Sequence, residues 1–171
     1  NNNLYNINQA VILAGGKGER LRPITNTIPK PMAPVNGIPF LDYLIFSLAQ
    51  AGFKKILILV GYKSEVIISR YEKNNNYGLD ISFSYSHENC QTGKRISDAY
   101  DQLDEYFLLL YGDNYWPIDL KSMIGLYNLN NALITTTVYS NNNGTGEYGK
   151  ENNIQVNKSS LVNKYDKKRN S

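Results

Sequence analysis

Apolar residues recur along the chain in two alternating patterns, short continuous runs and helical stripes. Runs at residues 10–13, 55–60 and 106–111 are typical of buried strands. Between the first two runs, residues 40–51 carry a stripe of apolar side chains along one helical face, and Gly52 follows as a helix-ending glycine. A strand, a loop, a helix and a second strand form a βαβ unit, whose two strands are parallel.

The same alternation continues to the end of the chain. Ser64 is expected to cap a helix that runs to Tyr71, and an apolar stripe made of Ile96, Ala99, Tyr100 and Leu103 predicts another helix. The other expected elements are a turn at 74–78, a strand at 80–86, a helix over 119–130, a β-rich segment at 133–140, a polar loop at 141–153 and strands at 154–156 and 161–165. We therefore predict an α/β fold, a Rossmann-like three-layer αβα arrangement with a mostly parallel central sheet.

The segment between the first strand and the first helix, residues 13–35, reads LAGGKGERLRPITNTIPKPMAPV. Its four prolines fix φ and lack an N–H group, so neither a long helix nor a central strand can run through it. Glycines at 15, 16 and 18 let backbone N–H groups approach an anion closely. These features predict a phosphate-binding loop.

The charge of the chain is concentrated in this loop. It holds Lys17, Arg20, Arg22 and Lys30 against Glu19 alone, and this surplus of three equals the net charge of +3 of the whole chain. Because the surplus is local and no nucleic-acid-binding motif accompanies it, a triphosphate is a better partner than nucleic acid.

Length and composition restrict the remaining possibilities. With 171 residues, 42% of them apolar, we expect a single domain over residues 9–171 after an unstructured stretch at 1–8. There is no basic-then-apolar leader and no apolar run long enough to span a bilayer, so a cytoplasmic location without membrane attachment is expected. One cysteine, Cys90, and one histidine, His87, exclude an internal disulfide and argue against a zinc site.

Two common phosphate-binding patterns do not fit the loop. A P-loop requires Ser or Thr after Gly-Lys, and here Gly18 follows Lys17. A dinucleotide fingerprint requires a third glycine at position 21, which is Leu21. The full stretch 13–35 instead resembles, position by position, the signature of the sugar-1-phosphate nucleotidyltransferases, whose fold is GT-A-like.

This resemblance implies an enzyme that makes a nucleotide sugar and pyrophosphate from an NTP and a sugar 1-phosphate, as in cell-surface polysaccharide synthesis, and it is compatible with a homo-oligomer. It implies Mg²⁺ as cofactor, bound by Asp113 after the run at 106–111. On the nucleotide side, the resemblance implies that Leu13, Ala14, Gly15 and Gly16 contact the base and ribose and that Gly18 and Arg20 contact the triphosphate. Lys30 is implied to contact the phosphates at the reacting centre. The residues implied to bind the sugar phosphate are Tyr148, Gly149, Asp166 and Lys167.

One segment departs from the family pattern. Where many members carry a Gly-Thr-Gly-Gly-Ala-like turn, residues 88–95 read ENCQTGKR, with Glu88 and Gly93 at the base-reading positions. A carboxylate accepts hydrogen bonds from guanine or cytosine amino groups, which favours GTP or CTP. Residues 92–95 (TGKR) are closer to the cytidylyltransferase branch, whereas residues 112–120 (GDNYWPIDL) are closer to the guanylyl or heptose-phosphate branch, and both remain open.

The expected chemistry suits a chain with one histidine. A sugar phosphate is already largely anionic at neutral pH, so its attack needs cations rather than a general base. Family members continue past the acid–lysine pair at Asp166 and Lys167 to a second metal-binding aspartate, and we therefore expect a C-terminally shortened chain. The alternative is a nucleotide-binding module without catalysis, or one that needs a further segment or partner.

Overall fold

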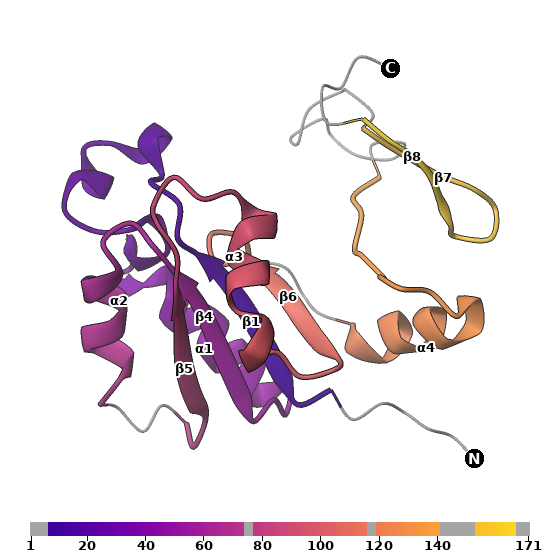
Figure 1. Ribbon diagram of the computed structural model, residues 1–171, viewed down its shortest axis with the longest axis horizontal. Helices are drawn as coiled ribbons and strands as arrows, with labels where there is room; N and C mark the ends of the chain where they lie inside the picture. The colour runs from indigo at the N-terminus through magenta and orange to yellow at the C-terminus, as the bar shows by residue number, and fades with distance from the viewer. Residues whose placement is uncertain (1–6, 74–76, 116–118, 141–152, 167–171) are drawn as a thin grey trace. The chain divides into compact units, whose positions relative to one another are not determined.

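A computed structural model describes residues 7–73, 77–115, 119–140 and 153–166 (Figure 1). The chain divides into two compact units, Asn1–Pro117 and Ile118–Ser171, and each is described by itself. The expected unstructured stretch at 1–8 lies mostly outside the described residues, and the single-domain organisation over 9–171 stays a prediction.

The first unit is built on a four-stranded parallel sheet. Its strands are β1 (Gln9–Ala14), β4 (Lys55–Val60), β5 (Asp80–Tyr85) and β6 (Phe107–Tyr111), in the order β5-β4-β1-β6. Every neighbouring pair is parallel, and in the register Val11 of β1 lies between Leu57 of β4 and Leu109 of β6. The predicted α/β class with a mostly parallel sheet is thus confirmed.

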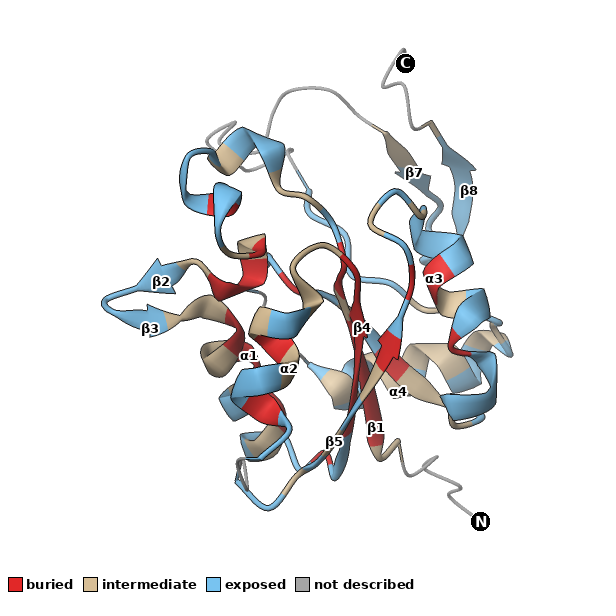
Figure 2. Ribbon diagram, turned by 60° about the vertical axis from the view of Figure 1, so that its left-hand side comes forward, coloured by how far each residue is buried: buried red, intermediate tan, exposed pale blue. Residues whose placement is uncertain are grey.

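Helices cover both faces of this sheet. Figures 1 and 2 show α1 (Phe40–Gln50) and α2 (Ser64–Tyr71) on one face and α3 (Thr92–Asp98) on the other. Gly52 follows α1 with φ of +91°, the left-handed conformation expected of a helix-ending glycine. The unit therefore has three layers, helix, sheet and helix.

The core lies along the two central strands. Because β1 and β4 are covered on both faces, almost all of their residues are buried (Figure 2). Val11, Leu57 and Leu59 pack with Ala99, which follows α3, on one side of the sheet. Both faces of β1 and β4 need apolar side chains, and for this reason apolar residues follow one another without interruption in these two strands.

The third apolar run, residues 106–111, was predicted to be a buried strand: the strand is confirmed over Phe107–Tyr111, but the expected burial is wrong. It forms β6, the edge of the sheet among the described residues, where Leu109 is 39% and Tyr111 56% exposed. An edge strand has a neighbour on one side only, so composition alone does not separate it from a central strand.

Three other expectations are corrected. Lys63, at φ of +51°, precedes α2, so Ser64 is the first helical residue and not the cap. The helix α3 ends at Asp98, and the predicted stripe continues into a separate turn, η4 (Tyr100–Gln102), in which Tyr100 is largely exposed. Residues 133–140 form no strand, because β-rich composition expresses packing against a neighbouring strand, and no described strand pairs with them.

The described part of the second unit contains one helix and one hairpin. The helix α4 (Leu120–Asn130) begins after Asp119, whose carboxylate accepts hydrogen bonds from the Ser122 backbone N–H at 3.1 Å and hydroxyl at 2.6 Å. These bonds lower the pKa of Asp119. The strands β7 (Ile154–Val156) and β8 (Val162–Tyr165) are antiparallel, close to their predicted positions.

Two predicted loops lie mostly outside the described residues. They are the turn at 74–78 and the polar loop at 141–153. Within the described ranges, no helix combines the length and apolarity needed to cross a membrane.

Candidate functional site

The carboxyl ends of the four parallel strands meet at one edge of the sheet. The chain leaves this edge after Ala14, Val60, Tyr85 and Tyr111, and the loops that follow carry most of the predicted site residues. Open α/β sheets bind ligands outside this edge, because the loops there converge and helix starts face the same space. The functional site of the first unit is therefore expected here.

The loop after β1 is ordered by short turns. It contains three one-turn 3₁₀ helices, η1 (Glu19–Leu21), η2 (Ile24–Asn26) and η3 (Lys30–Met32), and is followed by a small hairpin, β2 (Pro34–Val35) and β3 (Ile38–Pro39). The predicted absence of a long helix or central strand from this segment is confirmed. Prolines limit each helix to one turn, since they remove backbone donors.

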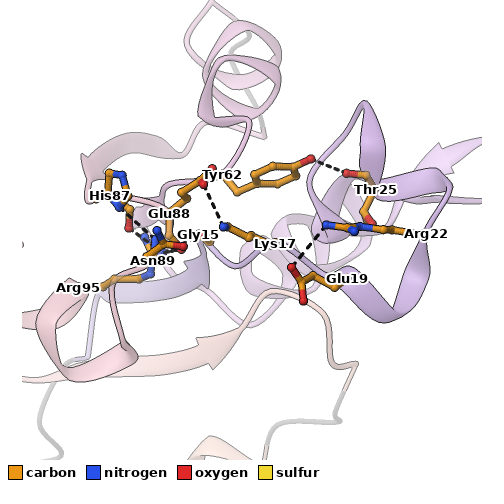
Figure 3. A network of polar contacts seen from close by, with 10 residues as sticks. All are labelled: Gly15, Lys17, Glu19, Arg22, Thr25, Tyr62, His87, Glu88, Asn89 and Arg95. Atoms are coloured by element: carbon orange, nitrogen blue, oxygen red, sulfur yellow. Dashed lines mark hydrogen bonds and ion pairs between the residues drawn. The ribbon is translucent and has the colours of Figure 1, made fainter.

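Contacts inside the loop fix its shape. Gly18 has φ of +60°, and a Cβ there would lie 2.8 Å from the Lys30 Cβ and 3.1 Å from the Thr25 Cγ2. The Thr25 hydroxyl donates a hydrogen bond to the Gly18 carbonyl at 3.0 Å. The Tyr62 hydroxyl, from the loop after β4, donates to the Thr25 carbonyl at 2.8 Å (Figure 3). The glycine-rich turn is thus held against the neighbouring strand end.

Two predicted site residues meet directly. The Lys30 Nζ lies 2.6 Å from the Asp113 Oδ2, although the residues are 83 positions apart. Gly112 brings the two loops together, because its N–H donates to the Leu13 carbonyl at 2.9 Å and a Cβ there would lie 3.2 Å from the Pro31 Cγ. Both charged side chains are about one-third exposed, at 35% and 33%, so a ligand can reach them.

A second ion pair joins the loop to the end of β5. The Lys17 Nζ lies 3.0 Å from the Glu88 Oε1 (Figure 3). Lys17 was not among the predicted site residues, although its place between two glycines was a signal that could have identified it. The pair brings the predicted base-reading carboxylate next to the predicted phosphate loop.

The other two cations of the loop differ from each other. Arg22 pairs with Glu19 at 3.4 Å within the loop. Arg20 is exposed in η1, and among the described residues no hydrogen bond or ion pair engages it. Its guanidinium can therefore accept an anionic ligand without breaking an existing contact.

The remaining predicted site residues are not assembled into one site. Leu13 and Ala14 are the last residues of β1, and Gly15 after them is buried. Gly16 and Gly93 are exposed, and a Cβ added at either would meet no atom within 4 Å. Asp166, in the second unit, follows β8 and donates its backbone N–H to the Asn153 carbonyl at 2.7 Å. Tyr148, Gly149 and Lys167 lie outside the described residues, so the acceptor side of the site stays a prediction.

Asp113 is the residue for which metal binding was predicted. No group of three or more His, Cys, Asp or Glu side chains suitable for a metal ion occurs in the described part of the chain. A structural metal site enclosed by protein ligands is therefore absent from these residues. Mg²⁺ does not require one, because it is commonly held by one or two carboxylates together with substrate phosphates.

The prediction missed one buried residue near the site. Arg95, in α3, is only 4% exposed and extends toward the loops after β1 and β5 (Figure 3). The signal was its spacing, because residue 95 lies four positions before the buried Ala99 and hence on the same helical face.

The end of β5 is also tied to α3. The Ser86 hydroxyl donates to the Asp98 Oδ2 at 2.7 Å, and Lys94 pairs with the same carboxylate. The hydrogen bond from Lys94 and then that from Ser86 lower the pKa of Asp98. The start of the loop that carries Glu88 is thus fixed to the helix that carries Arg95.

Comparison with known proteins adds independent support. The model of the nucleotidyl transferase family matches residues 9–160. The chain is 39% identical over 115 residues to the D-glycero-alpha-D-manno-heptose 1-phosphate guanylyltransferase of Campylobacter jejuni, a match that covers 67% of this chain and 52% of the relative. It is 37% identical over 116 residues to the UTP--glucose-1-phosphate uridylyltransferase AglF of Haloferax volcanii, covering 68% and 47%.

A third relative extends further along the chain. The probable glucose-1-phosphate cytidylyltransferase of Bacillus subtilis is 35% identical over 150 residues, covering 75% of this chain and 59% of the relative. The chain spans about half the length of the curated relatives it matches.

A solved structure has the same fold. HddC from Yersinia pseudotuberculosis, complexed with GMP-PN, superposes with a TM-score of 0.63 at 34% sequence identity and covers 71% of this chain and 54% of that one. The family resemblance predicted from residues 13–35 is confirmed by the family match over residues 9–160 and by this superposition. The chain belongs to the nucleotidyl transferase family.

Proposed function

We propose that the chain carries the nucleotide-binding side of an enzyme that transfers a nucleotidyl group from an NTP to a sugar 1-phosphate and releases pyrophosphate. The observation that carries the proposal is the contact of Lys30 with Asp113 beside the glycine-rich loop at the carboxyl edge of the sheet. The relatives support it, since they are named as sugar-phosphate guanylyl-, uridylyl- and cytidylyltransferases.

The reaction is an in-line displacement at the α-phosphorus of the NTP. A phosphate oxygen of the sugar 1-phosphate forms the new bond, and the bond to the pyrophosphate oxygen breaks. The attacking phosphate is already largely dianionic at neutral pH, since its second pKa is about 6, and no base has to remove a proton. The protein must instead bring two anions together and stabilise the leaving group.

The cations of the loop suit this task. Arg20 offers a planar fork of donors that can hold two phosphate oxygens at once, and no partner in the described part of the chain occupies it. Lys30 supplies a point charge. Its ammonium group would become available to a phosphate once Asp113 binds a metal ion in its place. Backbone N–H groups of the glycine-rich turn complete the phosphate cradle, with Gly18 at the triphosphate and Gly15 and Gly16 towards the ribose and base.

Asp113 is the residue that would hold Mg²⁺. Its carboxylate is a hard oxygen donor at the edge of the sheet, partly exposed and next to the proposed phosphate site, which fits the way this ion is bound. When bound, Mg²⁺ would neutralise charge on the triphosphate and on the departing pyrophosphate.

Glu88 is proposed to read the base. A carboxylate accepts hydrogen bonds and donates none, so it can pair with the amino groups of guanine or cytosine, and GTP or CTP is favoured over UTP. Its present partner is Lys17, at 3.0 Å. The Lys17 and Glu88 side chains are 32% and 38% exposed, so replacing their ion pair by contacts with a nucleotide costs little free energy.

The acceptor sugar phosphate is assigned to the second unit by family pattern. Tyr148 and Gly149 would contact the sugar, and Asp166 and Lys167 its phosphate. The competing proposal is a nucleotide-binding module without catalysis, which needs a further segment or partner for turnover. The two proposals share the nucleotide site and differ only in the second substrate.

The test is a pyrophosphate-release assay with each of the four NTPs, paired in turn with glucose, mannose and heptose 1-phosphates in the presence of Mg²⁺. We expect release for GTP or CTP with one of the sugars. We expect Asp113→Asn to lower the rate at least about 100-fold, because loss of a metal ligand removes several kcal/mol of charge stabilisation.

The matched control is Asp104→Asn, which also removes one carboxylate. Asp104 lies 3.0 Å from Lys55, at the amino end of β4 and away from the proposed site, and its variant should keep near-normal rates. NTP binding without pyrophosphate release for any pair would favour the binding module. Absence of NTP binding would overturn both proposals.

A further inference from the structure

Arg95 is a buried cation that forms no direct ion pair among the described residues. After the hydrogen bonds from Lys94 and Ser86, the charge of Arg95 also lowers the pKa of Asp98, from a longer distance. Its side chain extends from α3 into the first unit with 4% exposure, and no Asp or Glu among the described residues lies within ion-pairing distance of it. Burying an isolated charge costs several kcal/mol unless other polar groups compensate. The position therefore requires an explanation in terms of what the guanidinium holds.

The guanidinium is compensated by backbone carbonyl groups. Its Nη1 donates to the carbonyls of Val60 and Ser86, each at 3.3 Å. Its Nη2 donates to the carbonyls of Gly15 at 2.9 Å and of His87 and Glu88 at 3.1 Å (Figure 3). These oxygens belong to the ends of β1, β4 and β5, so one side chain connects three loops.

Two glycines leave room for this group. A Cβ at Gly15 would lie 2.2 Å from the Arg95 Nη1, and a Cβ at Gly61 would lie 2.5 Å from it. Any side chain at either position would displace the guanidinium from the carbonyls. The glycines at the ends of β1 and β4 are therefore matched to an arginine at position 95.

Of the three residues whose carbonyls accept from Nη2, Gly15 and Glu88 belong to the two loops of the proposed nucleotide site. Gly15 lies in the glycine-rich loop, and Glu88 is the proposed base-reading residue. The exposed ion pair of Lys17 with Glu88 also joins these loops, but such pairs typically contribute about 0–1 kcal/mol and hold geometry weakly. Backbone hydrogen bonds from Ser86 to Val60 and from Tyr62 to Gly15 join the strand ends, and Arg95 is the buried side chain that ties the Glu88 carbonyl to the glycine-rich loop.

We propose that Arg95 is a positioning residue for base selectivity, which holds the Glu88 segment at a fixed place relative to the phosphate loop through the carbonyl oxygens of Gly15 and Glu88. This role for Arg95 rests on the proposed function, and it adds a residue that sets how well the nucleotide site discriminates among bases. The triphosphate contacts come from other residues, so Arg95 governs which NTP binds best more than whether an NTP binds.

The test is a panel of dissociation constants for GTP, CTP, UTP and ATP, measured by calorimetry on the intact chain. Arg95→Met removes the donors at similar length, and Arg95→Lys keeps the charge but cannot reach carbonyls on three segments at once. We expect both variants to reduce the ratio between the best and worst NTP at least about tenfold. The ratio is informative because partial unfolding weakens the binding of all four NTPs by the same factor.

The matched control is Lys54→Met, which also removes one positive charge, at an exposed position just before β4 and at the opposite end of that strand from the proposed site. It should leave the ratio unchanged. The proposal is overturned if Arg95→Met and Arg95→Lys keep the wild-type ratio, or if both simply unfold, since Arg95 would then be structural. If the wild-type chain binds no NTP, the proposed function itself fails and this proposal fails with it.

Discussion

At the residue scale, the loop cations are held in a resting arrangement. Lys17 and Lys30 are each paired with a carboxylate from another strand end, whereas Arg20 has no partner among the described residues. Exposed ion pairs contribute about 0–1 kcal/mol, so a triphosphate can replace these carboxylates at small cost. Under the proposed function, these carboxylates would then be available for the base and for Mg²⁺, and NTP binding would be linked to assembly of the site.

Arg20→Ala tests this arrangement. Because the free guanidinium is proposed to fork onto the triphosphate, its loss should weaken NTP binding about 10- to 100-fold, as expected for charge-assisted hydrogen bonds. Arg22→Ala is the control, since Arg22 lies in the same loop but is paired with Glu19. Titration calorimetry should find its affinity within about twofold of wild type, and equal losses in both variants would refute a specific role for Arg20.

At the element scale, β4 and β6, the two strands beside β1, are expected to contribute differently to the free energy of unfolding. Leu57 and Leu109 flank Val11 at the same level of the sheet, but Leu57 is fully buried and Leu109 is 39% exposed. Leu57→Ala should lower the free energy of unfolding by about 2–5 kcal/mol, because it leaves a cavity in the core. Leu109→Ala should cost less than about 1 kcal/mol, because water already reaches that position.

Urea unfolding of the two variants provides the measurement. A loss for Leu109→Ala as large as that for Leu57→Ala would mean that a further strand or another chain covers β6 in solution. The pair of variants therefore also reports on whether β6 is an edge.

The contact between α1 and α2 gives a pH-dependent contribution to stability. Asp42 of α1 accepts hydrogen bonds from Arg70, whose Nε lies 2.9 Å away, and from the Tyr71 hydroxyl, both in α2. Burial raises the pKa of Asp42, but the hydrogen bonds from Arg70 and Tyr71 and the charge of Arg70 outweigh it and lower the pKa overall. A pKa lowered by folding stabilises the protein above the unfolded value, about 3.9, and the contribution is lost as the pH falls through the folded value.

Asp42→Asn should therefore be less stable than wild type at pH 7, and the difference should shrink below about pH 4. Chemical unfolding at pH 7, 5, 4 and 3 measures it. Ser69→Ala, in α2, is the control, because it removes a hydroxyl that donates to the Val66 carbonyl and no titratable group. A difference for Asp42→Asn that stays constant down to pH 3 would contradict the assigned ion pair.

At the scale of the whole molecule, the two units differ in how much they bury. The first unit has a continuous core along β1 and β4, whereas α4 of the second unit has no buried residue and Leu133 and Ile134 are 96% and 83% exposed. Local stability follows buried apolar contacts and protected backbone hydrogen bonds. The units should therefore open at very different free energies.

Hydrogen exchange followed by mass spectrometry on the intact chain checks this difference. Amides of β1 and β4 should exchange slowest, and amides of residues 133–138 should exchange at nearly unprotected rates. Slow exchange at 133–138 would mean that this β-rich segment has found a partner strand, as its composition predicted.

By itself, the sequence determined most of the local structure of the first unit and indicated a phosphate-binding loop. Periodicity located β1, β4, α1 and α2 to within a residue or two, because each element must present its apolar positions to the sheet or the core. The prolines and glycines of residues 13–35 determined a loop made of single turns, because they restrict φ and remove donors. The surplus charge of that loop indicated an anionic ligand.

Only the tertiary structure decided which elements are neighbours. The order β5-β4-β1-β6 makes β6 an edge, brings Asp113 to Lys30, and gives Arg95 carbonyl partners from three strand ends. Local periodicity carries no information on strand order or register, since it records which side of an element is apolar and not what covers it. The contacts that bring the candidate site residues together depend on strand order, and they join residues as many as 83 positions apart.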